Sequence, residues 1–399
     1  MNLKNRNQVL VLVSILILSC SSSKEEAVLP IIEISESDIV DFDKAIEAVE
    51  FIPLLNQVNS PVNLNCSVWD LKVTDNYFVY STICNPEAKI HFFDLEGNYV
   101  KTFAKNGDGP EEYQTIQGIN IEQDTINIAV GGGIIKQYHF VDFAFIGMVS
   151  LDEEATFIPS FTKISKTKWM TSPMFDGNVD QNGEFSIFKI MDSSNKQITD
   201  LPLKTTPLTA EISEGEFARL GHSYLLNYAF SDTLYLFENN KTSPFIGLDF
   251  GKRKPSSEDL KMNAEGFETA IMNQSLAFNV GKIWYTDNIS RLKTFALAKN
   301  PNMDISNVRT FPVHEVFIDH ETNNVIAFPS LAGWSNGKGD ATKGYFYDVL
   351  RADDWINALD KGILGKYGEK LEKTLGELRD FEDPVLIKYK VNTKNQLNL

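Results

Sequence analysis

Short β-strand patterns recur along almost the whole 399-residue chain, and turns rich in Asn, Asp and Gly separate them. The runs are alternating or wholly apolar and recur at roughly ten-residue intervals, which predicts an all-β sandwich, barrel or propeller. About 380 residues are too many for one sandwich, and no Pro- or Ser-rich linker divides them. One large closed repeat architecture therefore fits better than two domains. The clearest predicted strands are Val68–Val73, Tyr77–Ser81, Ile90–Asp94, Tyr99–Ala104, Ile126–Val130, Ile134–Phe140, Phe185–Met191, Thr233–Glu238, Phe245–Phe250, Lys282–Tyr285, Lys293–Ala298, Glu315–Asp319, Asn324–Phe328 and Val385–Val391.

The segment KIHFFDLEGNYVKTF, residues Lys89–Phe103, predicts a hairpin with a tight turn at Glu96-Gly97. The next residues, AKNGDGPEEYQ, invite comparison with a phosphate loop because they contain two glycines. Such a loop needs Lys followed by Ser or Thr after its second glycine, whereas Gly109 is followed by Pro110-Glu111. The segment is therefore predicted to cross to the next strand.

The hairpin and its crossing segment together resemble the NHL-type repeat. In that repeat a Phe-Asp-x-x-Gly turn is followed by a Gly-rich, Pro-containing connector that ends in an aromatic residue. The resemblance implies that the connector joins the outer strand of one propeller blade to the inner strand of the next. Gly107 and Gly109 would supply positive φ, Pro110 would stiffen the crossing, and Tyr113 would pack between blades.

Two later segments, YAFSDTLYLFENNKTSPFIGLDFGKRKP (Tyr228–Pro255) and FEDPVLIKYKV (Phe381–Val391), resemble the six-bladed β-propeller lipoproteins of Bacteroidota. The segment FIPLL, Phe51–Leu55, fits the first strand of that group. The resemblance implies an all-β fold, a six-bladed β-propeller, in which the first and last strands share one blade and leave no open edge. Phe51–Leu55 and Val385–Val391 are the expected closure.

Two segments have helical rather than alternating spacing of their apolar residues. They are Ser256–Phe278, which follows Pro255, and Ala352–Leu378, which is interrupted around Gly362 and Gly365. Both are predicted to be helical insertions that cover a face or an edge of the ring.

The amino terminus carries Lys4 and Arg6 ahead of the apolar run Val9–Leu18. The run has about ten residues, half of what a membrane-spanning helix needs, so it predicts a secretory leader. The sequence ILSC that ends at Cys20 resembles a bacterial lipobox, which implies lipidation of Cys20; an ordinary cleaved leader is the alternative. The following SKEE, Ser23–Glu26, is similar to export signals of Bacteroidota surface lipoproteins.

The expected organisation is a leader over residues 1–19, a lipidated flexible linker over 20–30 and a single β-propeller domain over 31–399. We expect the protein at the outer membrane, exposed at the surface or, alternatively, facing the periplasm, with membrane contact only through the lipid on Cys20. Loss of Lys4 and Arg6 with the leader lowers the formal net charge from −17 by two, to −19. Such an acidic body repels nucleic acid, and we expect a monomer.

Cys66 and Cys84 remain in a compartment that permits disulfides. If Thr74, Asp75 and Asn76 form the loop between two strands, opposite positions sum to 150, which pairs Cys66 with Cys84. A two-residue loop would shift this register by one, and two buried free thiols are the alternative.

The sequence shows no catalytic constellation. His314 and His320 in HEVFIDH are about 20 Å apart along a strand, so they cannot share one metal ion. The run Asn178–Phe185 begins like a calcium loop, but its twelfth position is Lys189, and a plain hairpin turn is the better reading. Gly131–Gly133 lies between two strands and predicts a turn. No metal site is predicted, and the cofactor stays unknown.

The predicted ligand site is the rim near the connector. Asp108, Glu111 and Glu112 would make that rim acidic, and Trp334 would reach over it from the long polar loop Gly333–Gly344. These acids could instead only cap turns, and Trp334 could instead cover the core. The expected function is a surface binding or interaction module for a glycan, a peptide or an outer-membrane partner protein. A lactonase- or lyase-like enzyme with a channel metal and a structural accessory of an uptake complex are the alternatives.

Overall fold

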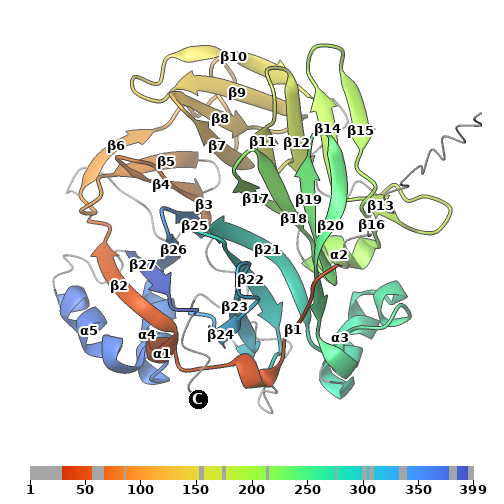
Figure 1. Ribbon diagram of the computed structural model, residues 1–399. Coiled ribbons are helices and arrows are strands. Elements are labelled where there is room, and N and C mark those ends of the chain that lie inside the picture. Colours follow the sequence, from red (N-terminus) through yellow and green to blue (C-terminus); the bar gives the residue numbers. More distant parts are fainter. Residues whose placement is uncertain are drawn as a thin grey trace, which may run out of the picture.

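Six β-sheets are arranged as blades around a central channel in the computed structural model (Figure 1). The chain therefore forms the predicted six-bladed β-propeller. The residues that the structure describes are 29–55, 67–84, 87–151, 157–172, 177–212, 215–274, 276–298, 303–304, 310–331, 339–376 and 384–393. The leader, Cys20 and the export-signal segment lie outside them.

Each blade has a first strand at the channel and a last strand at the outer rim, and the first three blades follow one another along the chain. Blade 1 contains β3 (Ser67–Val73), β4 (Phe78–Cys84), β5 (Glu87–Phe93) and β6 (Tyr99–Phe103). Blade 2 contains β7 (Gly118–Glu122), β8 (Thr125–Ala129), β9 (Ile134–His139) and β10 (Phe145–Ser150). Blade 3 contains β11 (Ser160–Lys163), β12 (Lys168–Ser172), β14 (Lys189–Asp192) and β15 (Gln197–Asp200), with β13 (Phe185–Ser186) and β16 (Lys204–Thr205) paired beside it.

Two of the last three blades, 4 and 6, contain a strand from the amino-terminal part of the chain. Blade 4 contains β17 (Glu216–Leu220), β18 (Ser223–Asn227), β19 (Thr233–Glu238) and β20 (Lys241–Asp249), and β1 (Ile31–Glu33) adds a fifth strand. Blade 5 contains β21 (Phe278–Thr286), β22 (Ile289–Phe295), β23 (Val313–Asp319) and β24 (Val325–Pro329). Blade 6 contains β25 (Asp340–Thr342), β26 (Tyr345–Leu350), β27 (Val385–Val391) and β2 (Ile46–Pro53).

The ring closes where the sequence predicts it. β2 pairs antiparallel with β27, and the register places Phe51 opposite Ile387 and Pro53 opposite Val385. The first and last segments of the propeller therefore share blade 6, so the chain cannot open there without breaking a strand ladder.

The amino-terminal segment also pairs with strands of blades 4 and 5. The sequence pattern does not predict this pairing. β1 pairs in parallel with the outer strand β20, with Ile31 opposite Gly247. The chain then forms a parallel bridge from Ile39 to Ala327 of blade 5 before it enters β2. One segment thus crosses the outer rim of blades 4, 5 and 6.

The connector between blades 1 and 2 has the predicted position. It leaves the outer strand β6 and enters the inner strand β7. The Tyr113 ring is buried between the two blades, 5.8 Å from the Phe103 ring, and its hydroxyl donates to the Ala88 carbonyl at 3.1 Å. Gly107 has a φ of +156°. The expectation of positive φ at Gly109 is wrong.

Gly109 lies close to the side chain of Glu112. Its N–H donates to the Glu112 carboxylate at 2.9 Å, and a Cβ on Gly109 would lie 3.0 Å from the same oxygen. A side chain at this position would therefore require the Glu112 carboxylate to shift by a few tenths of an ångström.

Both predicted helical insertions form. The first contains the short helix η3 (Asp259–Lys261) and α3 (Ala264–Gln274), which packs Phe267 and Ile271 against blade 5. The second contains α4 (Ala352–Asp360), η5 (Gly365–Tyr367) and α5 (Gly368–Gly376), and Gly362 and Gly365 interrupt it with φ of +62° and +52°. Its Trp355 and Leu371 pack on blade 6, so the insertion covers the outer edge of the ring (Figure 1).

Four more short helices are found among the described residues, and the sequence pattern does not predict them. They are η1 (Glu36–Asp38), α1 (Phe42–Ala45), α2 (Pro207–Ile212) and η2 (Gly251–Arg253). Of the predicted strands, Phe185–Met191 is broken into β13 and β14. The Ser186 hydroxyl donates to the carbonyls of Phe188 and Leu201, which ties the backbone locally at the break.

The loop between β3 and β4 is shorter than predicted, but the strand pairing at the far end of the hairpin has the predicted register. The Thr74 N–H donates to the Tyr77 carbonyl at 2.9 Å, so only Asp75 and Asn76 form the loop. A β-bulge between Val68 and Asp70 then shifts the pairing by one, and Ser67 lies opposite Ile83. Cys66, the predicted partner of Cys84, lies outside the described residues.

Candidate functional site: the central channel

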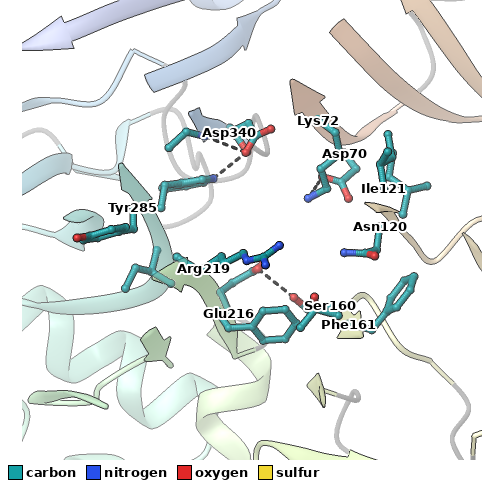
Figure 2. Close-up of a pocket in the computed structure, with 18 of the residues that line it drawn as sticks. Asp70, Lys72, Asn120, Ile121, Ser160, Phe161, Glu216, Arg219, Tyr285 and Asp340 are labelled. Atoms are coloured by element: carbon teal, nitrogen blue, oxygen red, sulfur yellow. Dashed lines mark hydrogen bonds and ion pairs between the residues drawn. The ribbon is translucent and has the colours of Figure 1, made fainter. Parts of the chain in front are cut away.

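All six inner strands line one pocket of about 330 Å³ in the channel (Figure 2). Its wall contains seven charged side chains that come from five different blades. They are Asp70, Lys72, Glu122, Glu216, Arg219, Lys282 and Asp340. Asn120, Ser160, Thr162, Phe161, Phe217, Trp284 and Tyr285 add polar and aromatic surface. The pocket is therefore a mixed-charge cavity inside a strongly acidic protein.

Lys72 is surrounded by carboxylates. Its ammonium lies 3.3 Å from Asp70 on the same strand. Burial would lower the pKa of Lys72, but Asp70, Asp340 and Glu216 together raise it above its ordinary value. Lys72 therefore stays charged at neutral pH.

Glu216 joins three blades. It accepts a hydrogen bond from the Ser160 hydroxyl of blade 3 at 3.1 Å, and Lys282 of blade 5 lies 2.8 Å from its other oxygen. Both charged side chains of this pair are about one-fifth exposed. Ser160 and Lys282 thus bind the two oxygens of Glu216, which fixes this carboxylate in the wall.

Asp340 lies at the start of the inner strand of blade 6. Its carboxylate accepts the N–H of Val73 in blade 1 at 2.6 Å and that of Ala341 at 2.8 Å. Burial raises the pKa of Asp340, while Lys72 and these backbone donors oppose the rise. Next to it, Trp284 of blade 5 donates its indole N–H to the Gly339 carbonyl at 2.8 Å. Blades 5, 6 and 1 are thus linked directly at the pocket wall.

Residues 28–390 match the family described as a domain of unknown function (DUF4934). The chain belongs to the DUF4934 family. A solved structure of a Bacteroides fragilis protein, described as an exported protein, is similar to this DUF4934 chain with a TM-score of 0.65 and 13% identity, over 90% of this chain and 99% of that one. A DUF4221 family member from Bacteroides vulgatus is similar with a TM-score of 0.55 and 13% identity, over 87% and 97%. None of the curated proteins matches. At these identities the likeness concerns the fold alone.

The DUF4934 chain places the predicted acidic rim on the connector, and the rim residues are not among those that line the pocket. Asp108 accepts a hydrogen bond from the Gln114 amide at 2.5 Å. Glu111 lies 3.5 Å from Lys105, and Glu112 binds the Gly109 N–H as described above. All three carboxylates therefore make local contacts within the connector. Trp334 lies outside the described residues.

The prediction that Gly333–Gly344 is a polar loop is partly wrong, because Asp340–Thr342 forms the inner strand β25. Its backbone pairs with β26, with Asp340 opposite Tyr347. A three-residue polar strand after several glycines carries no apolar alternation, so the sequence pattern gives no sign of it. The same change turns Asp340 from a loop residue into part of the pocket wall.

The other candidate motifs form local structure in this DUF4934 member. Asp180 accepts the N–H groups of Asn182 and Glu184 in a turn, and Lys204 lies 2.6 Å from its other oxygen. Gly131–Gly133 forms the predicted turn between β8 and β9. Within the part of the chain that the structure describes, no group of three metal-binding side chains occurs. No described helix has the length and apolar character to cross a membrane.

Proposed function

We propose that this protein is an exported, lipid-anchored binding module that holds a polar ligand, such as a glycan or a peptide, in the central channel. One observation carries the proposal. Five blades place seven charged side chains around one cavity of about 330 Å³, which lies in the size range of ligand pockets. Export and lipid anchoring are supported by the leader pattern and by Cys20 in its lipobox-like context.

The energetics of the wall support a binding role. Charged groups in a partly buried cavity cost free energy unless each finds a partner, and apolar side chains would close a channel at lower cost. The wall nevertheless contains the Asp70–Lys72 ion pair and the Glu216–Lys282 ion pair, and Ser160 also binds Glu216. Fixed charges of both signs around a cavity can bind a polar ligand without further reorganisation of the wall.

The test compares the channel with the sequence-predicted rim. The mature protein, extracted in detergent, is screened by calorimetry against defined oligosaccharides and peptides, and the best ligand is titrated into four variants. We expect Lys282→Met and Glu216→Gln to weaken binding at least tenfold, whereas Glu111→Gln and Trp334→Ala leave it unchanged. The opposite pattern would assign the site to the rim. Binding that ignores all four changes would refute the channel site, provided that every variant melts as the wild type does.

A further inference from the structure

We propose that one mouth of the pocket recognises a small zwitterion, an amino acid or a short peptide with both termini free. Glu122 would bind its ammonium group and Arg219 its carboxylate. The inference rests on the proposed function, because it names the ligand class for the same channel. It stands on two charged groups of the pocket that have no salt-bridge partner among the described residues.

The mouth is the end of the channel at which the inner strands turn into the second strands of their blades. Glu122 is the last residue of β7, and Arg219 is the penultimate residue of β17. Thr74 follows the end of β3, and Tyr285 is next to last in β21, so both belong to the same end. The connector with the acidic rim instead enters β7 at its beginning.

Arg219 is exposed and has one local hydrogen bond, in which its Nε donates to the Gly221 carbonyl at 3.0 Å. The two Nη groups make no hydrogen bond to any part of the chain that the structure describes. Figure 2 shows the side chain reaching toward the middle of the pocket. A guanidinium with two free N–H groups on one edge matches the geometry of a carboxylate.

Glu122 is the complementary group. Its carboxylate makes no hydrogen bond or salt bridge to the described residues, although it is only partly exposed. Burial raises the pKa of Glu122, while the positive charges of Lys163 and Arg219 oppose the rise. Arg219 is thus near enough to influence Glu122 without binding it. A ligand ammonium would supply the partner that this carboxylate lacks.

The two charges together select for a ligand that carries both signs. A simple anion would be repelled by Glu122 and by the acidic body, and a simple cation would meet Arg219 and Lys282. A zwitterion satisfies both groups at once. Four of the remaining wall charges have partners in the Asp70–Lys72 and Glu216–Lys282 pairs, and the fifth, Asp340, accepts two backbone N–H groups.

The experiment pairs each ligand group with one side chain. The mature protein is titrated by calorimetry at pH 7 with the twenty L-amino acids and a set of dipeptides, and the tightest binder is repeated in N-acetylated and C-amidated forms. We expect N-acetylation to weaken binding at least tenfold in the wild type and to have no further effect in Glu122→Gln. C-amidation should do the same in the wild type and have no further effect in Arg219→Met.

Two variants control for the loss of one charge elsewhere. Lys241→Met, on the outer strand of blade 4, and Glu96→Gln, in an exposed turn of blade 1, should bind as the wild type does. The inference is overturned if no amino acid or dipeptide binds, or if the terminal modifications act equally in wild type and variants. If another ligand still binds and Lys282→Met abolishes that binding, the channel function stands while the zwitterion class falls.

Discussion

Arg291 and Asp348 form an ion pair across the boundary between blades 5 and 6, with 2.9 Å between the guanidinium and the carboxylate. Both side chains are at least 95% buried. Glu315 binds the Nε of Arg291 at 2.8 Å, and the Tyr389 hydroxyl donates to Asp348 at 3.1 Å. Burial alone would lower the pKa of Arg291, but Asp348 and Glu315 raise it well above its ordinary value.

Removal of the Arg291 guanidinium should strongly destabilise the protein. Arg291→Met leaves two carboxylates buried without their main partner. We therefore expect the free energy of unfolding, measured with urea, to fall by about 3–5 kcal/mol. Lys390→Met is the matched control, because Lys390 and Glu47 form a 3.4 Å pair on neighbouring strands that is 41% and 53% exposed. Such a surface pair contributes about 1 kcal/mol or less. Equal losses in the two variants would contradict the role of the buried pair.

The stability of the protein should fall as the pH drops from about 6.5 toward 4. Burial, aided by Lys89, lowers the pKa of His91 to about 4 in the folded state, and its ring lies between Thr82 and Thr102. Above pH 6.5 the ring is neutral in both states and adds no pH dependence. Below it the unfolded chain binds a proton that the folded chain does not bind. One such group therefore lowers the free energy of unfolding by about 2 kcal/mol at pH 5.

The measurement is urea unfolding of the wild type and of His91→Gln at pH 7.5 and pH 5. The wild type should lose about 2 kcal/mol more than the variant between the two values. His314 and His320 also have pKa values lowered to about 4 by burial, so the variant should keep part of the slope. An unchanged slope in His91→Gln would show that this ring does not contribute.

Strands rich in residues that favour β structure are predictable from the sequence pattern, whereas the ring closure is implied by the resemblance to six-bladed propeller lipoproteins. Val385–Val391 coincides with β27, and Thr233–Glu238 coincides with β19, since β-branched and aromatic residues dominate both. The channel wall is less predictable. β25 has three residues without apolar alternation, and Lys72 and Glu216 look like ordinary surface positions of their strands. Their meeting depends on the ring, which brings together residues more than a hundred positions apart.

The strand register after the bulge in blade 1 supports the predicted disulfide between Cys66 and Cys84. The register beyond the bulge pairs Ser67 with Ile83, and if it continued by one residue it would set Cys66 against Cys84. We expect the unreduced, unfolded protein to contain no free thiol at either position, and reduction to cost about 3 kcal/mol for a loop of this length. Two titratable thiols under oxidising conditions would exclude the bond.

Lipidation is tested independently of the fold. Cys20→Ala removes the only site at which the lipobox-like sequence could be modified, so the protein should move from the membrane fraction to the soluble fraction or stay unprocessed. Cys84→Ala, the control, should stay with the membranes. A Cys20→Ala protein that is processed and remains membrane-bound would refute the anchor.

The last prediction concerns the closeness of blades 2 and 3. A Cβ on Gly118, at the start of the inner strand β7, would lie 2.4 Å from the Pro159 carbonyl oxygen of the next blade. Both groups belong to backbone, so neither can rotate away, and Gly118→Ala should cost about 1–3 kcal/mol through a shift of the strand. Gly147 on the outer strand β10 has no atom within 4 Å of its Cβ position and no positive φ, so Gly147→Ala should change stability by about 0.5 kcal/mol or less. Thermal unfolding of both variants decides the matter. Because Pro159 also lines the pocket, Gly118→Ala should weaken channel binding as well, and a variant that keeps both stability and binding would show that these inner strands have room to move.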